Sequence, residues 1–269
     1  MRRKIVALML AGVMATSFTA CGGSSASDSS SQKTSNSNSV SQKKEEKKEA
    51  KRAKRQHYRE LNEPPKLTVL EEVGNAVTHG IGAGLAIAGF VLLLLKSDTG
   101  LKVMASCFYG ISLILMFLMS CLYHSYKSGL AVKRIWRRFD YSSIYLLIGG
   151  TFAPMYLVYW ENVLGIVLFC VQWALIIAGI TIICVFGPGR FRPIHYTLYF
   201  VIGWSAIMFI PDWFRNDKPL LGWIVGGGIV YTLGMIPFVK DTKGMHFIWH
   251  IFVMLGAALH WFGMYLYVY

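Results

Sequence analysis

Seven long apolar stretches fill most of the chain after residue 76, and they restrict its fold more than any other feature. They lie at 77–95, 102–124, 141–159, 163–185, 194–211, 220–239 and 246–268. About 20 apolar residues in helical form cross a hydrocarbon layer of ~30 Å. Backbone polar groups in lipid must find partners within their own segment, so each stretch is expected to be a helix. The sequence therefore predicts an all-α membrane protein built as a seven-transmembrane-helix bundle.

Basic residues set the expected orientation of this bundle. The formal net charge is +13, but most of the charge lies in residues 43–66 and in particular loops. With the N-terminus inside, the inner loops hold nine Lys and Arg residues and the outer loops hold four. An excess of positive charge marks the cytoplasmic side of a membrane protein. We therefore predict a cytoplasmic N-terminus and an external C-terminus, and no nucleic-acid partner.

The first 65 residues differ in composition from the rest of the chain. Residues 1–21 resemble a bacterial lipoprotein signal, with a basic start, a short apolar run and small residues before Cys21. Residues 22–65 are rich in Ser and then in charge and cannot bury a core, so we expect a disordered linker there. The seven-helix domain is expected at 66–269. A lipidated Cys21 would lie outside, so the N-terminus is predicted to be cytoplasmic unless this signal is processed.

Two histidines, His246 and His250, stand four residues apart at the start of the last apolar stretch. On a helix this spacing puts both imidazoles on one face, with their Cβ atoms about 6 Å apart. Two neutral imidazoles so placed can share a cation. On spacing alone, a pair of histidines hydrogen-bonded to neighbouring helices explains the pattern equally well. An ionisable residue inside a transmembrane segment is costly, however, and usually indicates a functional site.

More polar residues are expected at the same end of the bundle, because consecutive spans alternate in direction. The second span ends with Ser120 and His124, and the third begins near Asp140. Three histidines from two helices, with one coordination position open, are typical of a catalytic zinc site. Zinc lowers the pKa of bound water to about 7. Asp140 would then hold that water or orient a histidine, and Ser120 or Tyr123 would donate to a developing oxyanion.

Other polar residues near this end also have structural interpretations. Asp140 can cap the third span and pair with a neighbouring arginine, and Ser120 can bond back to the carbonyl four residues earlier. For the remaining candidates a structural interpretation is favoured. Glu72 and Asn75 shape the start of the first span, with direct chemistry as the alternative, and His79 is a packed, hydrogen-bonded histidine, with a fourth-ligand role as the alternative. His195 is interpreted as interfacial, and His260 as too far along the last helix to join the site.

Six segments occur in a fixed order between residues 66 and 269: Glu72-x-x-Asn75-x-x-Thr78-His79, Ser120-x-x-x-His124, Asp140-Tyr141-Ser142-Ser143-Ile144-Tyr145, Gly150-Thr151-Phe152-Ala153-Pro154, Gly203-Trp204 and His246-x-x-x-His250. As a set they resemble the hemolysin III family, the bacterial branch of the progestin and adipoQ (adiponectin) receptors. The resemblance implies zinc bound at His124, His246 and His250, with Asp140 reaching the metal through water and Ser120 in the same motif. Cys121 and Tyr141 depart from the family pattern, and neither replaces a proposed ligand.

Two functions from different classes fit this pattern. The first is a zinc-dependent hydrolase that cleaves an amide or ester bond of a membrane lipid. The second is a pore-forming protein, as the hemolysin name implies, or a membrane-homeostasis protein in which zinc joins two spans. The sequence shows no polar stripe along a whole span, so a pore would require oligomerisation. In either case we expect a multi-pass protein of the bacterial plasma membrane.

Overall fold

The computed structural model describes the backbone of residues 31–240 and 242–269, and side chains from residue 41 onward. The lipoprotein-like segment at 1–21, including Cys21, lies outside these described residues. Contacts divide the chain into two units, Met1–Lys54 and Arg55–Tyr269. The second unit contains the membrane domain.

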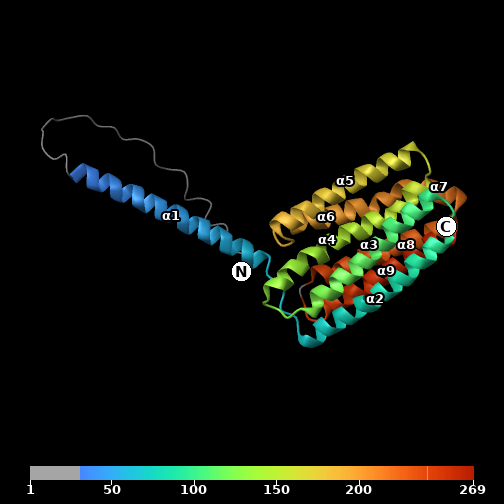
Figure 1. Cartoon of the computed structure of the whole chain (residues 1–269), viewed down its shortest axis with the longest axis horizontal. Helices are drawn as coiled ribbons and strands as arrows, with labels where there is room; N and C mark the ends of the chain where they lie inside the picture. The colour runs from blue at the N-terminus through green and yellow to red at the C-terminus, as the bar shows by residue number, and fades with distance from the viewer. Residues whose placement is uncertain (1–30, 241) are drawn as a thin grey trace. The chain divides into compact units, whose positions relative to one another are not determined.

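The membrane domain contains seven helices that are long and apolar enough to cross a membrane, as predicted. In chain order the elements are α2 (Val69–Lys96), α3 (Gly100–Ser125), α4 (Ala131–Pro154) with η2 (Met155–Tyr159), α5 (Val163–Phe186), α6 (Arg192–Gly203) with η3 (Trp204–Phe209) and α7 (Ile210–Asn216), α8 (Lys218–Val239) and α9 (Met245–Tyr267). Figure 1 shows them as one bundle, in which α2 packs against both α3 and the C-terminal α9. Helices from the two ends of the domain are therefore neighbours.

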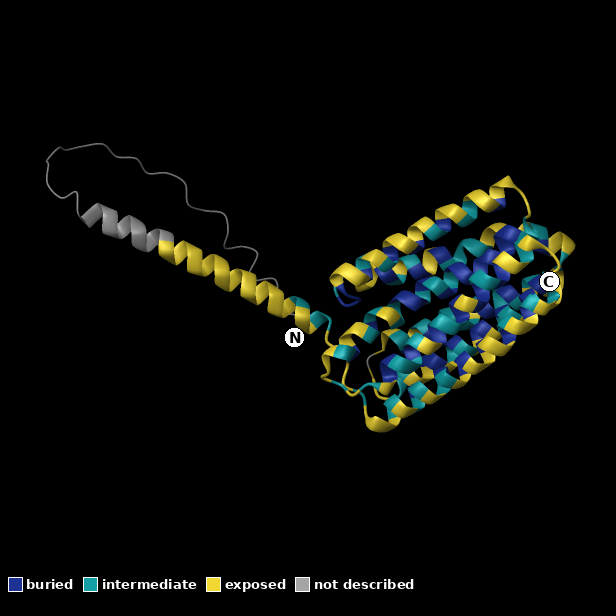
Figure 2. Cartoon of the chain, in the orientation of Figure 1, coloured by how far each residue is buried: buried dark blue, intermediate teal, exposed yellow. Residues whose placement is uncertain are grey.

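Burial differs strongly between these helices. Of the 18 most apolar consecutive residues in the span formed by α4 and η2, 72% are buried inside the protein. The corresponding share in α5 is 22%. Figure 2 shows exposed residues along most of α5. Large exposed apolar side chains such as Leu85, Val171 and Leu233 suit contact with lipid chains rather than water. The span of α4 is thus at the centre of the bundle, and α5 is at its edge.

Two spans depart from regular α-helix. Pro154 closes α4, and the chain continues as the π-helical turn η2. The fifth span changes to the 3-10 segment η3 before α7 begins near Pro211. Irregular backbone at membrane depth is tolerated where protein covers it. Phe209 and Trp213 of the fifth span are both fully buried, so other parts of the protein cover this segment.

The start of the first span lies earlier than the apolar stretch suggests. Helix α2 begins at Val69, eight residues before residue 77. A capping box fixes this start: the Thr68 hydroxyl accepts from the Glu71 backbone N–H, and the Glu71 carboxylate accepts from the Thr68 N–H. Such reciprocal bonds satisfy two of the free N–H groups at a helix start. About two extra helical turns therefore carry acidic residues to the end of the bundle.

The segment expected to be a disordered linker, at 22–65, differs from that expectation in its described part. Residues Ser31–Leu61 form the helix α1. Its second half is rich in Lys, Glu and Ala, which have high helix propensity, and a bond of 3.1 Å joins Lys48 to Glu45 one turn away. Nearly all side chains from 41 to 60 are exposed. The segment is helical without building a core of its own.

Candidate metal centre

Three histidines meet where α3 ends and α9 begins. His124 lies in the last turn of α3, and His246 and His250 lie one turn apart in the first turns of α9. Gly244 precedes α9 with a φ of 79°, a left-handed conformation that glycine adopts without strain. The Gly244 N–H donates to Glu71 Oε1 at 2.6 Å. This hydrogen bond holds the start of α9 against the start of α2, beside the end of α3.

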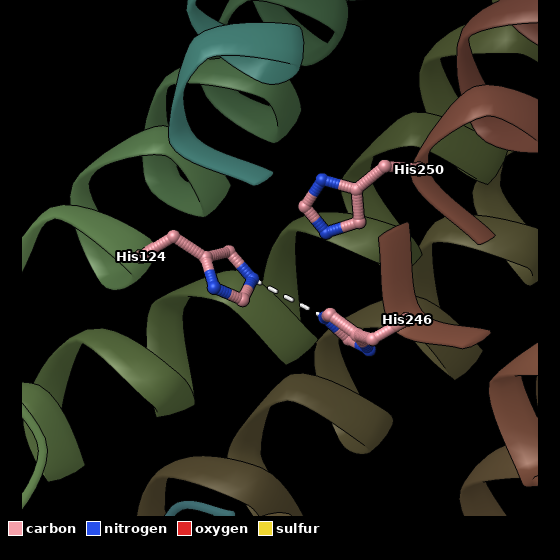
Figure 3. A group of neighbouring side chains, drawn as sticks. All are labelled: His124, His246 and His250. Carbon is pink, nitrogen blue, oxygen red and sulfur yellow. Dashed lines mark hydrogen bonds between the residues drawn. The ribbon is translucent and has the colours of Figure 1, made fainter. Parts of the chain in front are cut away.

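The three imidazole rings form a nearly equilateral triangle. Their centroids are 5.0 Å apart for His124 and His246, and 4.9 Å apart for each of the two pairs with His250. One nitrogen from each ring lies within 4.8 Å of the others. The Nε2 atoms of His124 and His246 approach to 3.2 Å, and Figure 3 shows the three rings turned toward one another. This group can hold a metal ion.

One of the distances between nitrogens agrees with the size of a tetrahedral site. Zinc–nitrogen bonds of 2.0–2.1 Å at tetrahedral angles place two ligand nitrogens about 3.3 Å apart. The observed 3.2 Å between His124 and His246 is close to this value. His124 and His250 are almost fully buried, so their nitrogens would bind a cation with little competition from water. The donor set is therefore suited to an ion that prefers imidazole.

Glu72 fixes the orientation of the His124 ring. Its Oε2 lies 2.8 Å from His124 Nδ1, and its Oε1 accepts from the buried Lys133 Nζ at 2.6 Å. Lys133 also donates to the Tyr126 carbonyl at 2.7 Å. With Nδ1–H donated to the carboxylate, the Nε2 lone pair of His124 faces the other two histidines. A carboxylate behind a ligating histidine is the usual support in metal sites.

The interpretation of Glu72 as only shaping the first span is therefore incomplete, and the sequence contained a signal for its second role. Thr68 and Glu71 have the spacing of a capping box, so Glu71 is occupied at the helix start. Glu72 is turned about 100° further around the helix and points elsewhere. Lys133 had no such signal, since it belongs to a basic run that looks like a solvated loop.

His79 and Asn75 line the side of the centre formed by α2. The His79 ring stacks on His250, with centroids 3.7 Å apart and an angle of 11° between the planes. Asn75 Nδ2 lies 3.5 Å from His124 Nδ1. His79 is buried and packed, as expected, and is outside the group of three possible ligands. Its ring nitrogens have no hydrogen-bond partner among the described residues, contrary to the expected hydrogen bond.

Ser120 and Asp140 come from adjacent helices near His124. Ser120 is buried one turn before His124 on α3. The Asp140 carboxylate, on α4, is close enough to interact with both Ser120 and His124. Because α4 begins at Ala131 with Leu130 as its N-cap, the alternative in which Asp140 caps this helix is wrong. Asp140 lies more than two turns inside α4, facing the centre.

Two other histidines have separate structural roles. His195 is fully buried, and its Nδ1 bonds with the Tyr145 hydroxyl at 2.9 Å, which joins α6 to α4; its interfacial depth stays a prediction. The arginine beside it in sequence, which suggested that position, faces outward. His260 Nε2 donates to the Ile224 carbonyl at 2.9 Å and joins α9 to α8. Its exclusion from the site agrees with this bond.

Comparison with known proteins identifies the family. A sequence model described as "Haemolysin-III related" matches residues 67–261, most of the membrane domain. The chain belongs to this family. Hemolysin-3 of Bacillus cereus is 37% identical over 205 residues, covering 74% of the chain and 93% of that protein. The human monocyte to macrophage differentiation factor is 28% identical, covering 79% and 91%. The adiponectin receptor protein of Drosophila melanogaster is 25% identical, covering 71% and 49%.

Proposed function

We propose that this membrane protein is a zinc-dependent hydrolase acting on an amide or ester bond of a membrane lipid. The observation that supports this most is the convergence of three buried or partly buried imidazoles, with Ser120 and Asp140 beside them. A structural zinc site usually has four protein ligands, and a catalytic one has three. The group found among the described residues has three.

Each residue of the centre has a distinct task in this proposal. His124, His246 and His250 would hold zinc, which supplies the Lewis acidity that lowers the pKa of water to about 7. The Asp140 carboxylate would orient the attacking water and accept its proton. The Ser120 hydroxyl would donate a hydrogen bond to the carbonyl oxygen as it gains negative charge. Both residues are in adjacent helices, Ser120 in α3 and Asp140 in α4.

An apolar cavity supports a lipid as the substrate. Its volume is about 140 Å³, and it is lined by residues of α4, α6, α8 and α9, including Thr151, Trp249 and Val253. Trp249 directly precedes the ligand candidate His250 in α9, and it packs against Phe238, which also contacts His246. An apolar cavity beside a polar centre suits a substrate with a hydrocarbon part and one reactive polar bond.

Pore formation or membrane homeostasis with a structural metal is the second candidate. It is favoured by the name Hemolysin-3 of the Bacillus cereus relative. In this case a metal would only join α3 to α9, and Ser120 and Asp140 would have no chemical task. For either function we propose a location in the bacterial plasma membrane, with the N-terminus in the cytoplasm.

Metal analysis of the purified full chain tests the hydrolase. Wild type should contain about one zinc per chain, and His246→Ala and His250→Ala should each lose both zinc and hydrolysis of lipid amides or esters. His260→Ala is the matched control for zinc content, because it removes a buried histidine from the same helix outside the group of three. Turnover that persists in His246→Ala would refute the mechanism. Vesicle permeabilisation by metal-free protein would favour the second candidate.

A further inference from the structure

A second pocket lies away from the three histidines, between the end of α1, the start of α4 and the turn from α5 to α6. Its volume is about 460 Å³. Four arginines line it: Arg59, Arg134, Arg138 and Arg190. The residues that line it include no Asp or Glu in the described part of the chain. Four guanidinium groups around one cavity create a strongly positive site.

The Arg190 side chain is held in place by aromatic rings. Its guanidinium carbon lies 4.2 Å from the centroid of the Tyr58 ring, 4.7 Å from that of Phe186 and 4.9 Å from that of Phe191. Cation–π contacts of this kind orient a guanidinium without neutralising it. The N–H groups of Arg190 therefore remain free to bind an anion, at little further cost in side-chain entropy.

The backbone around the pocket is also fixed. Asn62 donates to the carbonyls of Tyr58 and Phe186, each at 3.0 Å, and accepts from the Gly189 N–H at 3.0 Å. A Cβ at Gly189 would overlap the Leu61 carbonyl. The turn after α5 thus fits against the end of α1 only with glycine at this position. The pocket is a built feature of the fold rather than a gap between loose segments.

Apolar side chains form the other part of the lining. Ile135 of α4 and Val185 and Phe186 of α5 are exposed, and they belong to helices that cross the membrane. A ligand in this pocket would contact arginines at one end and apolar surface at the other. Inorganic phosphate would use only the arginines. A phospholipid with an anionic headgroup would use both.

We propose that this pocket binds the headgroup of an anionic phospholipid. The guanidinium group of arginine can donate two parallel hydrogen bonds to the oxygens of one phosphate. Basic pockets between transmembrane helices are known to bind such headgroups. Among the ion pairs of the described residues, the only one that involves these arginines joins Arg134 to Glu63 at 3.4 Å, with both side chains nearly half exposed. A pair so exposed is weak, and it leaves most of the positive charge available.

Native mass spectrometry of the detergent-purified full chain tests this proposal. Phosphatidylglycerol and phosphatidylcholine with the same acyl chains are titrated separately, and wild type should retain the first preferentially. Arg138→Gln/Arg190→Gln should weaken phosphatidylglycerol binding about thirtyfold, from roughly one kcal/mol per basic residue. Arg215→Gln/Lys218→Gln removes the same charge at the opposite end of the bundle and should leave binding unchanged (Figure 1).

Several outcomes would overturn the proposal. One is equal retention of the two lipids, and another is an equal loss in the control pair, which would indicate general surface charge. Displacement of phosphatidylglycerol by inorganic phosphate at equal concentration would indicate a site for free phosphate. If Arg138→Gln/Arg190→Gln does not fold, Arg59→Gln/Arg134→Gln removes two exposed arginines and should weaken binding equally. Zinc content, measured in parallel, separates this result from failure of the metal centre.

Discussion

Replacing Glu72 by glutamine tests how the centre prepares His124 to bind a metal. The carboxylate accepts from His124 Nδ1 at 2.8 Å and from Lys133 Nζ at 2.6 Å, and only 14% of its side chain is exposed. Glutamine has nearly the same shape and keeps one acceptor oxygen, but it carries no charge. Loss of a supporting partner of this kind lowers metal affinity about 10- to 100-fold, or roughly 1.4 to 2.7 kcal/mol.

The same substitution also leaves Lys133 without its counter-ion. The Lys133 side chain is fully buried, and breaking a buried pair by removing one partner costs about 3 to 5 kcal/mol of stability. We expect the lower end, since the amide oxygen and the Tyr126 carbonyl still accept from Nζ. Thermal unfolding of the metal-free protein measures this second effect separately from metal binding.

Lys133→Met is the control that separates the two effects. It removes the buried charge but leaves Glu72 facing His124. It should therefore lower stability while changing metal affinity less than about threefold, well below the effect of losing the supporting carboxylate. Competition of each variant with a chelator of known affinity gives the comparison. Unchanged affinity in Glu72→Gln, or an equal loss in Lys133→Met, would refute the role assigned to the carboxylate.

Three further predictions concern packing and orientation. His79→Ala should lower metal affinity about tenfold, within the range for supporting residues, because His250 loses its stacked neighbour. His79→Phe should restore most of that affinity, and equal affinities for the two variants would contradict the role of stacking. Gly150→Ala should destabilise the fold by about 1 to 3 kcal/mol, because its Cβ would lie 2.8 Å from the Phe108 carbonyl oxygen. Gly84→Ala is the control, since a Cβ there meets open space, and an unchanged thermal unfolding temperature for Gly150→Ala would be inconsistent with this packing. A C-terminal alkaline phosphatase fusion should be active and a green fluorescent protein fusion dark if the C-terminus is external; the reverse result would invert the orientation.

The fold was predictable because each helix must satisfy the same two constraints, a membrane-spanning length and an apolar surface. All seven spans follow from apolar length, although α4 begins at Ala131 rather than near residue 141, and the true start of α2 depends on the capping box at Thr68 and Glu71. The three histidines were predictable because alternating spans bring the end of α3 and the start of α9 to one side. Side-chain partners that depend on tertiary packing were not. The buried Lys133 and the bond from His195 to Tyr145 have no local pattern.

The position of the three histidines in the chain also has a consequence for biosynthesis. His124 and His246 are separated by 122 residues, and the second of them lies in the last helix to leave the ribosome. At 5 to 20 residues per second, roughly 6 to 24 s pass between the synthesis of one and of the other. During that time a growing chain has a single histidine of the three and cannot close the centre. A metal bound by all three histidines would therefore require that the last helix has been made, and chains that end before His246 could not form the centre.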